Sequence, residues 1–164
     1  MSQIKIESFK PEQRDAVANL ILHIQREEFA LPVTLDDQPD LIDIPSFYQK
    51  NLGNFWVAKL DDRVVGTIAL LDIGHAMGAL RKMFVAADCR GKEHGVATLL
   101  LKTVLAWSAA HAFKEIYLGT TDRFLAAHRF YEKNGFVEIP RLSLPTTFPI
   151  MTVDSKFYRY TFLE

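Results

Sequence analysis

Apolar residues recur along the chain with two different periods, and the change of period separates predicted strands from predicted helices. Short runs rich in Val, Ile, Leu and Phe predict strands at residues 4–9, 55–60, 63–73, 79–85, 116–120, 136–139 and 156–163. Apolar residues three or four apart predict helices at residues 12–29, from the end of a loop at 90–97 to about 112, and at 124–134. Residues 31–45 carry three prolines and four aspartates, which favours a loop with one short helix.

The order of these elements limits the topology. Three successive strands between residues 55 and 85 are joined by tight turns, so they form an antiparallel meander. The next strand follows the long helix and runs parallel to a meander strand, because a helical crossover joins parallel strands. The chain is therefore expected to be of the α/β (α+β) class, with a mixed sheet and helices on both faces.

Length and composition agree with a single domain over residues 1–164. Hydrophobic residues make up 49% of the 164 and charged residues 24%, so the chain is long enough to bury a full core. The net charge is -1, from 19 basic and 20 acidic residues. This balance argues against nucleic acid as a partner, because a general nucleic-acid coat needs an excess of positive charge.

The expected compartment is the cytoplasm. Cys89 is the only cysteine, so no internal disulfide forms. Residues 1–9 alternate polar and apolar side chains and lack the apolar core of a signal peptide. The longest apolar stretch, residues 96–113, contains Lys102 and His111 and falls short of the ~20 apolar residues that span a bilayer. We therefore expect no contact with a membrane.

The segment with the clearest chemistry joins a predicted strand to the long helix through a glycine-containing loop. Its residues 83–97 are Met-Phe-Val-Ala-Ala-Asp-Cys-Arg-Gly-Lys-Glu-His-Gly-Val-Ala. The first turn of a helix presents free N–H groups and the positive end of the helix dipole, and glycine lets the backbone approach an anion. Arg90 and Lys92 add positive charge, so the loop suits a phosphate or pyrophosphate. A glycine turn before a core helix explains the same pattern, and both interpretations stay open.

Two segments, residues 92–97 and residues 126–136, together resemble sequence motifs of the GNAT superfamily of N-acetyltransferases. Lys92-Glu93-His94-Gly95-Val96-Ala97 is similar to the family's acetyl-coenzyme A signature Gln/Arg-x-x-Gly-x-Gly/Ala, with Lys92 in place of the usual first residue. The loop before Gly95 is two residues longer than the family's common form. Residues 126–136, Ala-Ala-His-Arg-Phe-Tyr-Glu-Lys-Asn-Gly-Phe, resemble the family's Ala-x-x-Phe-Tyr-x-x-x-Gly-Phe helix.

The resemblance implies a fold and a co-substrate. The sheet is implied to be mostly antiparallel, with about six to seven strands and about four helices on its two faces. Parallel strands at residues 79–85 and 116–120 are implied to splay apart, with the pantetheine arm of acetyl-coenzyme A between them. The resemblance assigns binding of the coenzyme to Met83, Phe84 and Val85 on the first strand, to Arg90, Gly91, Lys92, Glu93, His94, Gly95, Val96 and Ala97 in the loop, and to Thr120 and Tyr131.

Tyr131 matches the family's general acid, whose task is to protonate the departing coenzyme A thiolate. A phenol with a pKa of about 10 can protonate a thiolate with a pKa of about 8.5 when the two are in contact. A backbone N–H near Met83 is implied to stabilise the oxyanion of the reaction. Many members carry an Asn where this chain has Phe124, and Thr120 or Thr121 is a candidate substitute.

The general base is not assigned by the sequence. Many relatives use a carboxylate on the strand that carries Met83, but residues 79–82 provide none. Glu28, Asp72 and His75 are candidates that would act through water. Asp36, Asp37, Asp40 and Asp43 lie where relatives build the acceptor site, and they either attract a cationic amine or form a solvated loop.

The sequence favours an enzyme that moves the acetyl group of acetyl-coenzyme A to a primary amine of a small molecule or peptide. Attack is expected to be direct, in a ternary complex, because no activated Cys or Ser nucleophile is evident. Two alternatives are a non-catalytic acyl-coenzyme A sensor or scaffold, which the missing base supports, and a phosphate-binding module for another nucleotide. The five histidines form no recognised ligand pair, so no metal is expected. A homodimer would be ordinary for this family.

Overall fold

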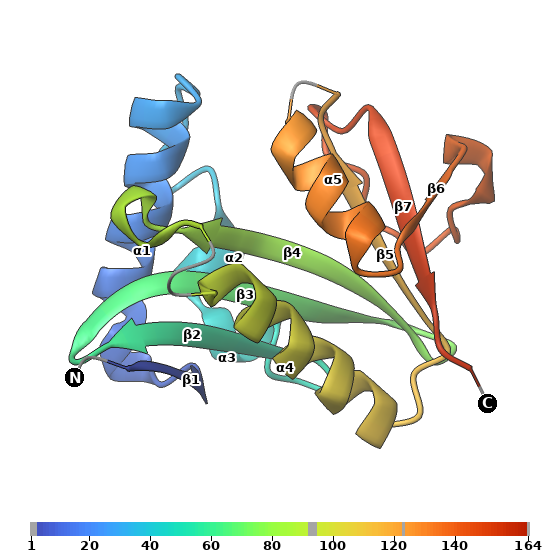
Figure 1. Cartoon of the computed structure of the whole chain (residues 1–164), viewed down its shortest axis with the longest axis horizontal. Helices are drawn as coiled ribbons and strands as arrows, with labels where there is room; N and C mark the ends of the chain where they lie inside the picture. The colour runs from blue at the N-terminus through green and yellow to red at the C-terminus, as the bar shows by residue number, and fades with distance from the viewer. Residues whose placement is uncertain (1–2, 92–94, 123, 164) are drawn as a thin grey trace.

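One seven-stranded sheet runs through the molecule in the order β1-β2-β3-β4-β5-β7-β6 (Figure 1). The computed structural model describes residues 3–91, 95–122 and 124–163. The strands within them are β1 (Ile4–Ser8), β2 (Asn54–Leu60), β3 (Arg63–Gly74), β4 (Met77–Val85), β5 (Glu115–Thr120), β6 (Val137–Ile139) and β7 (Lys156–Thr161). The α-helices are α1 (Arg14–His23), α2 (Pro39–Ile42), α3 (Ile44–Phe47), α4 (Val96–Ala110) and α5 (Leu125–Lys133).

The sheet is mixed and mostly antiparallel, which confirms the expected fold class. Every pair of neighbouring strands in the described residues is antiparallel except β4 and β5. Those two are parallel because α4 connects them as a crossover.

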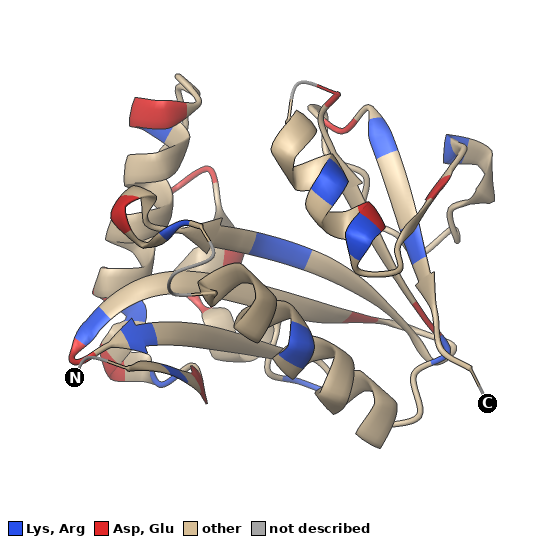
Figure 2. Ribbon diagram, viewed as in Figure 1, with Lys and Arg blue, Asp and Glu red and all other residues tan. Residues whose placement is uncertain are grey.

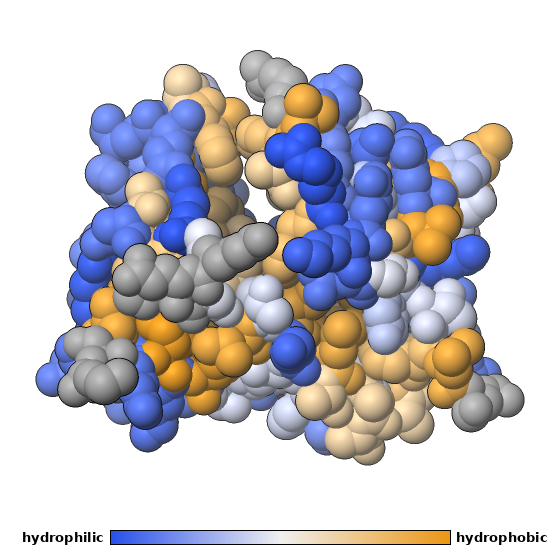
Figure 3. Space-filling model, in the orientation of Figure 1, coloured by the Kyte–Doolittle hydropathy of each residue, from blue (hydrophilic) through white to orange (hydrophobic). Residues whose placement is uncertain are grey.

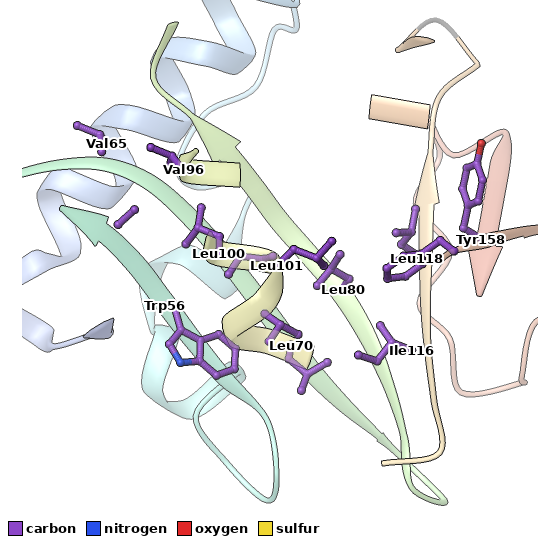
Figure 4. Close-up of a cluster of buried hydrophobic side chains, with 14 of the residues drawn as sticks. Trp56, Val65, Leu70, Leu80, Val96, Leu100, Leu101, Ile116, Leu118 and Tyr158 are labelled. Carbon is purple, nitrogen blue, oxygen red and sulfur yellow. The ribbon is translucent and has the colours of Figure 1, made fainter. Parts of the chain in front are cut away.

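The parallel strands β4 and β5 pair at one end and separate at the other. Their ladder in the described residues has three steps, from Met77 opposite Glu115 to Ala79 opposite Tyr117. Beyond that point β4 continues to Val85 and β5 to Thr120, but the two strands no longer pair with each other. Their ribbons diverge in Figures 1 and 4. The structure thus has the splayed pair of parallel strands that the family resemblance implied, and this opening positions the candidate site.

Helices cover both faces of the sheet. On one face, Leu100 and Leu101 of α4 pack with Leu80, Ile116 and other buried side chains, as Figure 4 shows. The same cluster reaches Tyr131 of α5, so α4 and α5 share this face. Ile21 of α1 and Leu41 of α2 belong to a separate cluster on the opposite face.

The predicted strands agree with the observed ones in number and order; the helices agree in order, and the elements differ at their ends. The first helix starts with a 3-10 turn at Pro11–Gln13 and ends in a π-helical turn at Ile24–Glu28. The segment predicted as a loop with one short helix contains two, α2 and α3. β4 begins two residues before the predicted start at 79, because His75 and Ala76 both adopt a positive φ and turn the chain within two residues.

Candidate active site

The candidate site is the opening between β4 beyond Ala79 and β5 beyond Tyr117, which we call the strand gap. Figure 3 shows the surface hollowed between the part of the molecule that carries α1 and the part that carries α5. Hydrophobic residues form part of the walls of this hollow. Backbone groups on the facing edges of two separated strands need partners, so the strand gap suits an extended ligand with its own amide groups.

A β-bulge at Lys82 bends β4 where the strand gap begins. The register between β3 and β4 changes between Thr67 and Ala69, and Lys82 has a φ of 52°. The Thr67 hydroxyl donates a hydrogen bond of 2.7 Å to the Lys82 carbonyl oxygen. Because a bulge kinks the strand and increases its twist, it accounts for the divergence of β4 from β5.

Buried polar side chains in α2 and at the ends of α2 and α3 hold Lys82 in place. The Lys82 ammonium donates 2.7 Å to the Gln38 Oε1 and lies 3.5 Å from the Asp40 carboxylate. The Tyr48 hydroxyl donates 2.6 Å to that same carboxylate. Burial lowers the pKa of Lys82, with Asp40 opposing the change, and burial raises the pKa of Tyr48. This network stabilises the bulge from the face opposite α4 and α5.

Tyr131 reaches the strand gap from α5. Its hydroxyl lies 3.9 Å from the sulfur of Met83 on β4, the partner that the structure shows for it. Burial raises the pKa of Tyr131 to about 12, so the phenol is protonated at all physiological pH values. A neutral, poorly bonded phenol beside the gap is suited to donate a proton to a ligand atom that arrives there.

The N-terminus of α4 carries two glycines in the left-handed region. Gly95 is the N-cap residue with a φ of 61°, and Gly91 has a φ of 100°. A Cβ added at either position would meet nothing within 4 Å, so open space lies beside both. Val96 is buried in the core, whereas Ala97 is half-buried. This geometry agrees with an anion site at the start of α4; Lys92, Glu93 and His94, assigned to the same loop, lie outside the described residues.

Arg90, expected to add charge beside a phosphate, has partners of its own. Its Nε donates 2.9 Å to the Val85 carbonyl oxygen, and its Nη1 lies 2.6 Å from the Glu28 carboxylate. Glu28 was one of the three candidate bases, and this ion pair turns it toward Arg90. The pair links the end of the first helical segment to the end of β4.

The far side of the gap is formed by the end of β5 and the start of α5. The Thr120 carbonyl accepts 2.9 Å from the Ser155 N–H, and the Thr121 carbonyl lies 2.7 Å from Nε2 of His128. The ring of Phe124 stacks on Phe29, with centroids 4.6 Å apart. This stack joins the segment after α1 to the start of α5, so the position where many relatives have Asn supplies an apolar contact in this chain.

The other two candidate bases lie at the wrong end of the sheet. The Asp72 carboxylate accepts from the N–H groups of Leu52 and Gly74, which stabilises the turn between β3 and β4. His75 is exposed in that turn. Both lie beside the start of β4, where it pairs with β5, and the strand gap opens at its other end.

Three of the four aspartates in residues 36–43 form hydrogen bonds or an ion pair within the protein. Asp37 bonds Thr34, and Asp43 accepts from the Ser46 N–H at the start of α3. Asp40 is buried in the Lys82 network, while Asp36 is exposed.

In the described part of the chain no three His, Cys, Asp or Glu side chains gather as a metal site would require. None of the described helices has the length and hydropathy needed to cross a membrane.

Sequence reasoning missed two charged residues at the gap, Arg81 and Asp154. Arg81 lies two residues beyond the last residue of β4 that pairs with β5, and Asp154 precedes β7 with its carboxylate against Gly119 of β5. Nothing in the local sequence marks either one, because they are 73 positions apart and meet only through the order of strands in the sheet.

Comparison with known proteins gives a consistent family. The family model described as "Acetyltransferase (GNAT) family" matches residues 18–136. N-acetylaspartate synthetase of Xenopus tropicalis is 38% identical over 102 residues, which is 61% of this chain and 37% of that protein. The human N-acetylaspartate synthetase is 37% identical over 100 residues, or 59% of this chain and 32% of that protein. The chain thus spans about a third of the length of these curated relatives.

Solved structures match over nearly the whole chain. An acetyltransferase of the GNAT family from Staphylococcus aureus Mu50 superposes with a TM-score of 0.91 at 38% identity, covering 96% of this chain and 98% of that one. An acetyltransferase from Streptococcus agalactiae 2603 also gives a TM-score of 0.91, at 29% identity, covering 97% and 98%. Both matches include the region of the strand gap, since they cover nearly all residues.

Proposed function

The chain belongs to the acetyltransferase (GNAT) family, and from this membership we propose that it is a single-domain, acetyl-coenzyme A-dependent N-acetyltransferase. Its acceptor is a primary amine of a small molecule or peptide. The names of the N-acetylaspartate synthetases, which match over part of the chain, support an amine acceptor. The observation that carries the proposal is the strand gap, with the hydroxyl of Tyr131 beside Met83 at its edge and the N-terminus of α4 nearby.

The residues around the gap fit the shape and charge of this co-substrate. The unpaired edge of β4 at Met83, Phe84 and Val85 supplies backbone groups for the pantetheine amides. The open space beside Gly91 and Gly95 leaves room for a pyrophosphate at the start of α4. Thr120, at the end of β5, faces the same opening from the other strand. The described part of the loop therefore suits the assigned role, and Arg90 contributes less charge because Glu28 neutralises it.

In the ternary complex, acetyl-coenzyme A supplies an acetyl group activated as a thioester. A backbone N–H near Met83 donates to the carbonyl oxygen as negative charge develops on it. The neutral acceptor nitrogen forms a bond to the carbonyl carbon and gives up a proton to water, and the carbon–sulfur bond breaks. Tyr131 donates its phenolic proton to the departing sulfur, and its burial without a charged partner keeps that proton available.

Two measurements on the purified chain test this proposal. Calorimetry with coenzyme A, ATP and NAD is expected to show binding of coenzyme A that neither nucleotide displaces. A thiol-release assay with acetyl-coenzyme A and a panel of amines is expected to show turnover with at least one amine. Binding without turnover on any amine would favour the non-catalytic sensor, and absence of coenzyme A binding would overturn both.

A matched pair of glycine variants locates the binding site. Gly95 at the start of α4 and Gly74 in the turn after β3 both have a positive φ, and an added Cβ meets nothing within 4 Å at either. Gly95→Ala and Gly74→Ala therefore carry a similar backbone penalty of about 1 kcal/mol. Only Gly95→Ala is expected to weaken coenzyme A binding, because only its new methyl group lies where the pyrophosphate approaches. Equal dissociation constants for the two variants would place the anion site elsewhere.

A further inference from the structure

Arg81 and Gly119 face each other across the entrance to the strand gap. The last paired residues of the parallel ladder are Ala79 on β4 and Tyr117 on β5. Two residues further along each strand are Arg81 and Gly119, and side chains two apart point to the same face of a sheet. Ala79 and Tyr117 pack together in a cluster separate from the one that contains α4 and Tyr131. Arg81 and Gly119 therefore border the gap on the face opposite Tyr131.

Arg81 brings a positive charge that forms no direct ion pair with a carboxylate of the described residues. None of the ion pairs among the described residues includes Arg81. Its guanidinium carbon lies 5.7 Å from the ring centroid of Phe47 and 5.9 Å from that of Tyr48, and its Nη2 lies 3.7 Å from the sulfur of Met151. Aromatic rings hold the planar faces of a guanidinium, and its five N–H donors lie around the edge. The side chain is half-buried and fixed in position, with donors left for a ligand.

Asp154 places a negative charge on the other strand of the gap. Its Oδ2 accepts 3.0 Å from the Met151 N–H, and it too takes part in no ion pair of the described residues. The carboxylate lies on the surface of β5: a Cβ added at Gly119 would be 2.5 Å from Oδ2. Glycine at this position therefore leaves the room that the carboxylate occupies.

Arg81 and Asp154 act on each other without touching. Burial raises the pKa of Asp154, and the positive charge of Arg81 lowers it, so the two lie within electrostatic reach. Both contact Met151, one through its sulfur and the other through its N–H. On its outer side Asp154 borders a surface hollow whose charged residues are Glu138, Arg141 and Lys156, and Lys156 pairs with Glu138 at 3.2 Å.

We propose that the acetyl acceptor is an α-amino acid, whose carboxylate is bound by Arg81 and whose amine is held by Asp154. The proposal rests on the proposed N-acetyltransferase function and names the substrate class of the same site. A positive and a negative group separated across the gap match the two charges of an amino-acid zwitterion. A polyamine would place a second positive charge near Arg81, and a simple amine or a peptide N-terminus would leave Arg81 without a carboxylate.

The same arrangement supplies the base that the sequence did not reveal. The acceptor's ammonium group gives one proton to the Asp154 carboxylate, and the nitrogen lone pair then forms the bond to the acetyl carbon. The carbon–sulfur bond breaks, and the sulfur takes the Tyr131 proton from the opposite face of the sheet. The nitrogen gives its second proton to water as the carbon–sulfur bond breaks. The products are the N-acetylated amino acid, free coenzyme A and one net proton, because Asp154 then releases its proton to water and the Tyr131 phenolate takes one up. Asp154 is a catalytic residue in this scheme, whereas Arg81 determines specificity.

Matched substrate pairs test the proposal. The thiol-release assay compares L-leucine with 3-methylbutylamine, L-tyrosine with tyramine, and L-ornithine with putrescine, together with L-aspartate. At least one amino acid is expected to have a kcat/KM ten or more times that of its decarboxylated partner. Equal or greater activity on the amines would overturn the amino-acid assignment and leave the acetyltransferase function standing. Absence of thiol release with every compound would instead remove the proposed function itself.

Substitutions test the roles of Arg81 and Asp154 separately. Arg81→Met is expected to raise KM for the amino acid at least tenfold while changing kcat/KM for the matched amine less than threefold. Arg81→Lys keeps the charge and is expected to retain part of the preference, and Arg14→Met, at an exposed arginine of α1, is the control that leaves both substrates unchanged. Asp154→Asn is expected to lower kcat, to raise KM for the amino acid and the matched amine alike because both present an amine, and to remove the acidic limb of the kcat–pH profile. An unchanged preference in both Arg81 variants would overturn the role of Arg81, and an unchanged profile in Asp154→Asn would overturn that of Asp154.

Discussion

Replacing Tyr131 by Phe removes one oxygen atom from the edge of the strand gap. That oxygen has a weak acceptor, the sulfur of Met83 at 3.9 Å, and the ring keeps its packing against neighbouring aromatic side chains. The free energy of unfolding is therefore expected to change by less than about 1 kcal/mol. Any large effect on turnover must then come from the chemistry of the lost hydroxyl.

The expected effect on turnover is large. General acid catalysis contributes roughly 10²–10⁴-fold, so Tyr131→Phe is expected to lower kcat by on the order of 10²-fold or more. Because burial raises the pKa of Tyr131 to about 12, the wild-type phenol keeps its proton, and its ionisation is not expected to reduce kcat at pH 10 or below. The affinity for coenzyme A is expected to persist, since the hydroxyl acts on the sulfur only as it departs.

Thiol-release kinetics and calorimetry with coenzyme A measure the two quantities separately. Tyr160→Phe is the matched control, because Tyr160 lies opposite Ile116 at the paired end of the sheet, away from the gap. A kcat for Tyr131→Phe within threefold of the wild-type value at several pH values would remove Tyr131 from the mechanism.

Three further predictions concern substitutions at Gly119, Lys82 and Asp154. Gly119→Ala would push the Asp154 carboxylate away by about 1 Å, so we expect kcat to fall on the order of 10²-fold. If this loss arises through Asp154, it should not add to the loss in Asp154→Asn when the two substitutions are combined in a double-mutant cycle. Lys82→Met leaves the Asp40 carboxylate buried without its cation, so urea unfolding at pH 7 should show a loss of about 3–5 kcal/mol that Asp40→Asn largely restores; a loss below 1 kcal/mol would contradict this. Burial raises the pKa of Asp154, so ionisation of this carboxyl opposes folding once the pH rises above its unfolded pKa. In urea unfolding, Asp154→Asn should therefore increase the free energy of unfolding more at pH 7 than at pH 4. An equal effect at the two pH values would contradict the raised pKa.

The order of strands and helices was predictable because it depends on local periodicity. β3, with a long run of Val, Ile, Ala and Leu, and α4, with apolar residues at helical spacing, bury their side chains as those patterns require. Element ends were less predictable, since they depend on neighbours distant in sequence. The early start of β4 reflects a two-residue turn, and the two helices in residues 39–47 form where Asp40 pairs with Lys82 and accepts from Tyr48.

The candidate site was predictable only where it lies on a continuous motif. Gly95 and Tyr131 belong to short segments with a recognisable pattern; the structure has Gly95 as the N-cap of α4 and the Tyr131 hydroxyl beside Met83 of β4. Arg81 and Asp154 carry no such pattern, because their proximity arises from the parallel ladder of β4 and β5 and from the glycine at position 119. A search for a base along the sequence of β4 could not find a carboxylate supplied by the segment before β7.

The central claim is that coenzyme A occupies the gap between β4 and β5 with its sulfur at Tyr131. A crystal structure of the chain with coenzyme A tests it most directly. The account predicts pantetheine amides bonded to the β4 backbone near Met83 and Val85, and the sulfur within hydrogen-bonding distance of the Tyr131 hydroxyl. Coenzyme A bound elsewhere, or its thiol pointing away from Tyr131, would contradict it.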